Sequence, residues 1–217
     1  MRMTTRSLVI ACAVVALTIF LFAVATSGPK IVSAAPTAGS QVPYELSYTK
    51  DGALVPPVGQ YREWVYLTSG LDMSYAANPS SDMSMFDNVF VNPEAYRSFL
   101  STGTWPDKTV FVLETRGAGS KSSINKSGHF QSENVMGLEL HVKDEARFPG
   151  KWAFFDVASE SKATLFPQTA ACYSCHAQHA AVDTTFVQFY PTLLPVAEAK
   201  GTFSESYRKE AAHEKAK

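Results

Sequence analysis

The sequence has no cluster of positive charge. Its 19 lysines and arginines are scattered along the chain and are balanced by 20 acidic residues, which gives a formal net charge of −1 at pH 7. A surface that binds nucleic acid needs basic residues gathered on one face or stripe. We therefore exclude nucleic acid as a partner.

The sequence also lacks internal repeats, and its length leaves little room for a second domain. The 217 residues are 46% hydrophobic and 12% aromatic, which is enough for one ordinary core. We expect one globular domain over residues 61–200. Residues 35–60 are rich in Pro, Gly, Ser and Thr and are expected to form a flexible leader, and residues 201–217 a charged, solvated tail.

Residues 1–34 have the pattern of a secretory signal peptide. Met1–Arg6 is basic, Leu8–Val24 is almost wholly apolar, and small residues follow up to Ala34. We expect export to the periplasm or beyond, with cleavage near Ala34 and loss of Cys12. The apolar run is also long enough for an uncleaved membrane anchor.

Short β-prone runs in the middle of the chain and helices near its ends predict an α+β fold with an antiparallel sheet. Strands are expected at residues 88–91, 109–116, 137–143 and 152–157, and a polar loop at residues 117–128. A helix is expected to start at Pro93, after Asn92 as N-cap, and to stop at Gly103.

The apolar pattern also predicts which faces are buried. Tyr96, Phe99 and Leu100 form one stripe of the expected helix, which should pack on the sheet. Residues 138–143 alternate strictly, so that strand should have one buried and one wet face. Val110–Leu113 is apolar on both faces, so both should be covered, one by the helix and one by a cofactor.

The segment Cys172-Tyr173-Ser174-Cys175-His176 has the C-x-x-C-H pattern that attaches c-type haem. Two cysteines at this spacing can each add to a vinyl group at one edge of the porphyrin, and His176 then becomes the proximal iron ligand. We expect one covalent haem c on a C-terminal helix. Attachment requires an exported protein, which agrees with the signal peptide.

Three other interpretations of these cysteines compete with haem. A structural disulfide is plausible in an oxidising compartment, but it gives no reason for the adjacent histidine. A thioredoxin-like pair would be expected near a βαβ pattern rather than after an antiparallel meander. A zinc site needs two more ligands, and only His179 is near. His179 is more often a surface or propionate-contacting residue than a ligand.

An electron-transfer cytochrome would supply a sixth iron ligand, usually methionine or histidine. Methionines in such positions are more often flexible core filler. In small electron carriers the attachment motif usually lies near the start of the mature chain, whereas here it lies near the end. The candidates for a sixth ligand are Met73, Met83, Met85, Met136, His129 and His141.

Over residues 61–195 the chain resembles the family of cytochrome P-460 and cytochrome c′-beta, β-rich proteins with one haem and a C-terminal attachment motif. The landmarks of this resemblance, besides the haem motif, are Tyr61–Val65, Asn92–Tyr96, Gly103–Asp107, Gly137–Glu139, Arg147–Phe148, Trp152–Phe154 and Thr185–Pro191. Each is weak alone, but together and in this order they are specific.

The resemblance implies a five-coordinate haem with one face open to hydroxylamine or nitric oxide, an electron-transfer partner and a homodimer. In the family's hydroxylamine-oxidising members a lysine is cross-linked to the porphyrin, and the matching position here is Leu113. Lys108 lies five residues earlier and should point to the opposite face. A pocket arginine of some members falls on Asp87.

With Leu113 and Phe111 lining it, the distal pocket should be apolar and should favour diatomic gases over a polar amine. Our first hypothesis is therefore a haem protein that binds or processes nitric oxide or related nitrogen compounds. An oxidoreductase acting on hydroxylamine comes second, and an electron carrier third. Further candidates are Phe86, Phe90 and Phe154 as lining and Glu139 and Asp87 as acid or base.

Overall fold

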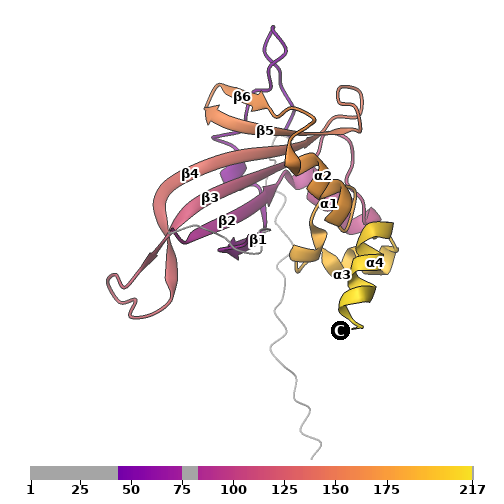
Figure 1. The fold of residues 1–217 in the computed structure, drawn as a ribbon. Helices are drawn as coiled ribbons and strands as arrows, with labels where there is room; N and C mark the ends of the chain where they lie inside the picture. The colour runs from indigo at the N-terminus through magenta and orange to yellow at the C-terminus, as the bar shows by residue number, and fades with distance from the viewer. Residues whose placement is uncertain (1–43, 75–82, 217) are drawn as a thin grey trace, which may run out of the picture. The chain divides into compact units, whose positions relative to one another are not determined.

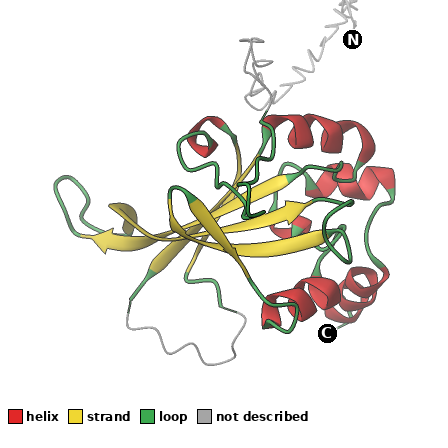
Figure 2. Ribbon diagram, turned by 90° about the horizontal axis from the view of Figure 1, so that it is seen from above, coloured by secondary structure: helices red, strands yellow, loops and turns green. Residues whose placement is uncertain are grey.

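The computed structural model describes residues 44–74 and 83–216 and has an α+β fold, which confirms the predicted fold class. Six strands form one antiparallel sheet in the order β1-β2-β3-β4-β5-β6, so strands that follow one another in the chain are neighbours in the sheet (Figure 1). Four helices gather to one side of the strands (Figure 2). The strands are β1 (Val65–Leu71), β2 (Met85–Val91), β3 (Val110–Ser120), β4 (His129–Lys143), β5 (Trp152–Ser159) and β6 (Lys162–Leu165), and the helices are α1 (Pro93–Thr102), α2 (Ala171–His179), α3 (Leu194–Lys200) and α4 (Glu205–Glu214), with short 3₁₀ turns at Tyr61–Glu63 and Val187–Phe189.

The N-terminal segment that resembles a signal peptide lies outside the described residues. In the described part of the chain, no helix is long and apolar enough to cross a membrane.

Helix α1 has the predicted bounds, but its capping residue acts differently. Gly103 ends the helix at φ 75°, the left-handed conformation that glycine adopts without a steric penalty. The Asn92 side chain makes no cap hydrogen bond; its Oδ1 accepts from the buried N–H of Val110 at 2.8 Å and ties the helix start to β3. Phe99 is fully buried, whereas Leu100 is 43% exposed, so the buried stripe is narrower than predicted.

Strands β3 and β4 extend beyond the other strands as a two-stranded ribbon (Figure 1). The polar loop expected at residues 117–128 is therefore shorter, because β3 runs to Ser120 and β4 begins at His129. A Cβ at Gly119 would lie 2.6 Å from the Phe130 ring. Gly119 thus makes room for a cross-strand aromatic side chain and does not mark a turn.

Two hydrophobic clusters cover the two faces of the sheet. The first joins α1 and the C-terminal segments to the sheet around Phe99 and Phe111, and the second lies around Val112 on the opposite face. Part of the expected flexible leader belongs to the second cluster: Leu54 is 1% exposed, and Tyr44 packs edge-on against Trp64. The described residues 44–60 are therefore packed against the domain, because their few apolar side chains cover this face.

The C-terminal tail is ordered over α4. Ser204 caps this helix by accepting a hydrogen bond from the backbone N–H of Tyr207, and the Phe203 and Tyr207 rings pack against the first cluster. Its polar face is solvated, as expected for a charged tail.

Strand β4 has the predicted wet face only at Glu139, and the other two polar side chains of that face are buried. His141 is only 8% exposed and Lys143 only 6%. The Lys143 ammonium donates to the carbonyl of Trp105 at 2.8 Å and to Asp183 at 2.6 Å, which compensates its burial. Polar residues on a strand can therefore mark a buried site.

Candidate cofactor site

The C-x-x-C-H residues lie on helix α2. Cys172, Cys175 and His176 are three and four positions apart, so their side chains share one side of the helix. Both cysteines are free thiols and partly buried. This arrangement presents two thiols and an imidazole together.

The three motif side chains of α2 face a cavity of about 490 Å³, a size typical of ligand sites. Phe111 and Leu113, predicted to line the pocket, lie on its wall together with the three motif residues. The register explains this: Phe111 pairs with His141 and Leu113 with Glu139, so these side chains share one face of the sheet. The cavity is lined by Thr68, Gly70, Met73, Asp87, Val89, Phe111, Leu113, Glu139, Leu140, His141, Phe154, Ala171, Cys172, Cys175, His176, Phe186, Phe189 and Tyr190.

His176 is held in one orientation and one tautomer. Its Nδ1 lies 2.7 Å from the carbonyl oxygen of Thr184. A carbonyl only accepts, so Nδ1 carries the proton and Nε2 keeps its lone pair. Burial lowers the pKa of His176, although the bond to Thr184 acts in the opposite direction. The result is a neutral imidazole suited to metal ligation.

The His176 ring is enclosed by aromatic neighbours. Its centroid lies 4.2 Å from that of Phe186, 4.7 Å from Phe154 and 5.0 Å from His141. The His141 ring stacks on Phe154 at 4.0 Å, and its buried Nε2 has no hydrogen-bond partner among the described residues. Burial lowers the pKa of His141 well below its usual value, so this ring is neutral too.

Only two of the six candidate sixth ligands, Met73 and His141, line the cavity; all six lie within the described residues. His141 meets the His176 ring edge to face, and a porphyrin cannot fit between two rings in contact. In this arrangement His141 and His176 could not bind one iron from opposite sides of a porphyrin. Met73 remains a candidate.

Two carboxylates share the cavity wall. Burial raises the pKa of Glu139, and the charges of Asp156 and Asp87 raise it further. Much of the Glu139 surface is nevertheless accessible. Asp87 accepts a hydrogen bond from Thr115 Oγ1 at 2.9 Å.

The remaining sequence candidates lie elsewhere. Phe154 lines the cavity, but Phe86 and Phe90 do not. Lys108 is half exposed and pairs with Asp144. His179, also half exposed, lies 3.3 Å from Glu210 at the surface. Among the described residues, no group of three or more His, Cys, Asp or Glu side chains is placed to hold a metal ion.

Sequence reasoning assigned no role to three features of this site: the Thr184 carbonyl, the Phe186 ring and the contact between His141 and His176. Glu139 and His141 are two positions apart on one strand, so their side chains point to the same face of the sheet. This spacing could have indicated that His141 lies at the same site as Glu139. No sequence pattern could have indicated the Thr184 carbonyl, because every residue has a backbone carbonyl.

The fold and the site together define an α+β protein with a cofactor cavity between one face of an antiparallel sheet and a helix. The family model described as cytochrome P460 matches residues 58–187, more than half of the chain, and the chain belongs to this family. A search of curated proteins found no match. Family membership makes the protein a cytochrome with an iron-containing haem cofactor.

The residues at the site fit haem. Two free thiols and a neutral imidazole with a free lone pair face one cavity. The opposite wall is largely apolar, as a porphyrin surface requires.

Proposed function

We propose that the chain is an exported c-type haem protein whose open site binds or processes nitric oxide or related small nitrogen compounds. One observation carries this proposal: Leu113 lines the cavity shared by Cys172, Cys175 and His176. The family resemblance implies a cross-linking lysine at this position in the hydroxylamine-oxidising members. Leucine cannot form that bond.

The three motif residues of α2 would hold the cofactor in different ways. The Cys172 and Cys175 thiols would each add across one vinyl group, so the bonds are thioethers and the porphyrin cannot dissociate. His176 would donate its Nε2 lone pair to the iron. Bound haem supplies an iron centre that binds small nitrogen ligands and exchanges single electrons. We expect those electrons to pass to or from a separate redox partner.

The wall of the cavity favours uncharged diatomic ligands. Phe111, Leu113, Val89 and Phe154 present hydrocarbon to the space next to α2. These four side chains offer no hydrogen bond to a polar amine and cost a diatomic gas little desolvation, and the carboxylates of Glu139 and Asp87 are polar exceptions on the same wall. This is the physical reason for preferring nitric oxide over hydroxylamine.

The carboxylates support hydroxylamine oxidation as a second candidate function. That reaction releases protons, and Glu139, with its raised pKa, and Asp87 are groups in the cavity that can accept them. Met73 supports an electron carrier as the third candidate, since its thioether lies on the same wall.

The test is the absorption spectrum of the purified full-length product, oxidised and reduced, followed by addition of nitric oxide and hydroxylamine. We expect covalent haem c that is high-spin, binds nitric oxide and does not turn over hydroxylamine. A red-shifted ferrous Soret band with hydroxylamine turnover would instead establish the oxidase, and Glu139→Gln should then lower turnover more than nitric oxide binding. A six-coordinate low-spin spectrum that Met73→Leu converts to high-spin would establish the carrier.

Covalent attachment of haem and export of the protein are tested by two separate measurements. Intact mass should show one haem that survives denaturation, and Cys172→Ala with Cys175→Ala should abolish this retention. N-terminal analysis should show a chain starting near Ala35; an intact N-terminus in the membrane fraction would favour the anchor.

A further inference from the structure

The turn at residues 182–185 contains two non-glycine residues with positive φ, of which Thr184 is the strained one. Val182 and Thr185 exchange backbone hydrogen bonds of 2.8 and 3.3 Å, which closes a tight turn. Between them, Asp183 has φ 48° and Thr184 φ 59°. Turns with two positive φ values favour Asn-Gly, and a β-branched residue is rare in this conformation. Such strain persists only where the surroundings over-determine it.

The strained turn carries the hydrogen-bond acceptor of the site. The Thr184 carbonyl accepts from Nδ1 of His176 at 2.7 Å. The Thr184 hydroxyl is buried and has no hydrogen-bond partner among the described residues. Its side chain therefore does not hold the turn in place, and the backbone conformation must be imposed from neighbouring residues.

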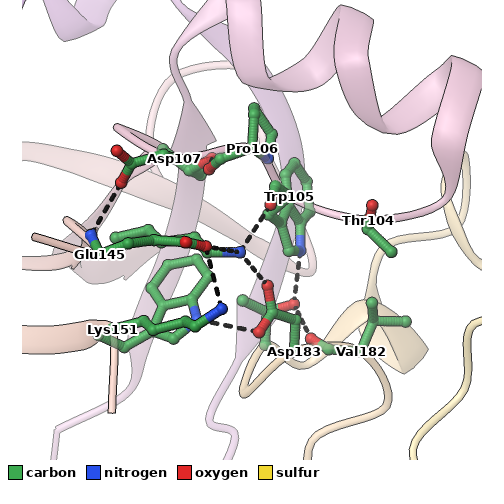
Figure 3. Close-up of polar contacts among 12 residues, drawn as sticks. Thr104, Trp105, Pro106, Asp107, Glu145, Lys151, Val182 and Asp183 are labelled. Carbon is green, nitrogen blue, oxygen red and sulfur yellow. Dashed lines mark hydrogen bonds and ion pairs between the residues drawn. The ribbon is translucent and has the colours of Figure 1, made fainter. Parts of the chain in front are cut away.

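Those neighbours are two side chains on the sheet and one in the loop between α1 and β3. The Asp183 carboxylate accepts from Lys143 Nζ at 2.6 Å and from Trp152 Nε1 at 3.1 Å, and Figure 3 shows these contacts converging on Asp183. Trp105 Nε1 donates to Thr185 Oγ1 at 2.8 Å. The turn is thus fastened on both sides of Thr184.

Lys143 is unusual because a lysine side chain is rarely buried, and contact with the turn gives a reason for its burial. It is 6% exposed and sits at the end of β4 with its ammonium between Asp183 and the Trp105 carbonyl. A buried ion pair is weak evidence for stability, because desolvation offsets the attraction. Its more specific consequence here is to fix the position of the Asp183 side chain, and with it the backbone that follows.

We propose that Lys143, Asp183 and Trp152 are positioning residues that hold the Thr184 carbonyl against Nδ1 of His176 and so set how strongly this imidazole donates to the haem iron. The inference rests on the proposed role of His176 as the iron ligand. A proximal histidine that donates a firm hydrogen bond from its other nitrogen is more basic, which stabilises ferric over ferrous iron. Loosening the turn should reverse this.

The test uses the full-length haem-loaded protein with Asp183→Asn. We expect the preference for ferric iron to fall about tenfold, the lower end of such outer-shell effects, which raises the reduction potential by about 59 mV for a one-electron couple. The ferrous iron–histidine stretching frequency should fall with it. Asp51→Asn is the matched control, since Asp51 is exposed and hydrogen-bonds to Thr49 in its own turn, and it should change neither value.

A second variant covers failure of Asp183→Asn to fold. Lys143→Met with Asp183→Asn removes both charges, so no unpaired charge stays buried, and the same shifts are expected. If wild-type protein has histidine-ligated haem and the folded variants keep its potential and stretching frequency, the positioning role is wrong while the proposed function stands. If wild-type protein has no haem ligated by His176, both are wrong.

Discussion

Replacing Glu114 with glutamine should remove one source of the protein's acid sensitivity. Glu114 lies on β3 beside Leu113 and therefore faces the opposite side of the sheet, where it is 1% exposed. Tyr61 Oη donates to its carboxylate at 2.6 Å, Arg116 Nε donates at 2.6 Å, and Arg62 forms a further ion pair.

These contacts outweigh burial and set the direction of the pH dependence. Burial alone would raise the pKa of Glu114, but the hydrogen bonds from Arg116, Tyr61 and Arg62 lower it from 4.5 to about 2. The folded pKa is below the unfolded value, so the stabilisation is present above about pH 4.5 and is lost as pH falls towards 2. A difference of this size corresponds to about 3 kcal/mol in the free energy of unfolding.

The assay is urea denaturation of Glu114→Gln and wild-type protein at several pH values between 2 and 7. At pH 7 the variant should be about 3 kcal/mol less stable, because Arg116 also loses its partner, and the gap should close as pH falls below 4.5. Glu205→Gln, which breaks an exposed pair with Lys209, is the matched control and should cost no more than about 1 kcal/mol. A gap between wild type and Glu114→Gln that stays constant down to pH 2 would refute the reasoning.

Three further predictions test the fold and the site. Phe99→Ala should cost about 3–5 kcal/mol in urea denaturation, whereas Leu100→Ala, on the exposed side of α1, should cost less than about 1 kcal/mol; equal costs would contradict the observed burial. Asn92→Ala should cost about 1–3 kcal/mol because the buried Val110 N–H loses its acceptor, and Asn92→Asp, which keeps an oxygen there, should retain most of that stability by the same assay. His176→Ala should leave haem bound through its thioethers but alter the spin state in the absorption spectrum, and exogenous imidazole should restore it; an unchanged spectrum would exclude His176 as the ligand.

Leu113, where the family resemblance implies a cross-linking lysine in the hydroxylamine-oxidising members, bears on the proposed chemistry. Leu113 and Glu139 are partners in the strand register, so the cavity wall combines hydrocarbon with an adjacent acid. The acid is expected in a protein that removes protons from hydroxylamine, whereas the leucine is expected in a protein that only binds a gas. Nitric oxide and hydroxylamine additions to one protein therefore separate the two functions directly.

Local patterns predicted what depends on local chemistry. Pro93 and Gly103 marked the ends of α1, and the runs in β2 to β5 predicted strands where strands occur. Propensity and capping act within a few residues, so the signals lie next to the elements they define. The five residues from Cys172 to His176 likewise contain their chemistry in one short segment.

Burial and the second layer of the site depended on tertiary structure. The polar face of β4 was expected to be wet because alternation does not show what covers a strand. Likewise Gly119 was expected to lie in a loop because its cross-strand neighbour Phe130 was unknown. Part of the expected leader packs because distant residues provide a surface for Leu54.

The sequence by itself determined the α+β class, the family resemblance, the helix α1 and the residues expected to attach haem, since each rests on residue types at short spacing. Only the tertiary structure decided that His141 contacts His176, that Glu139 shares a cavity with the motif, and that a strained turn presents the Thr184 carbonyl to the histidine. These features join residues 8 to 37 positions apart, and the contact of Lys143 with Asp183 spans 40 positions. Contacts across such distances arise from the register of the sheet and the packing of α2 on it, which local pattern does not specify.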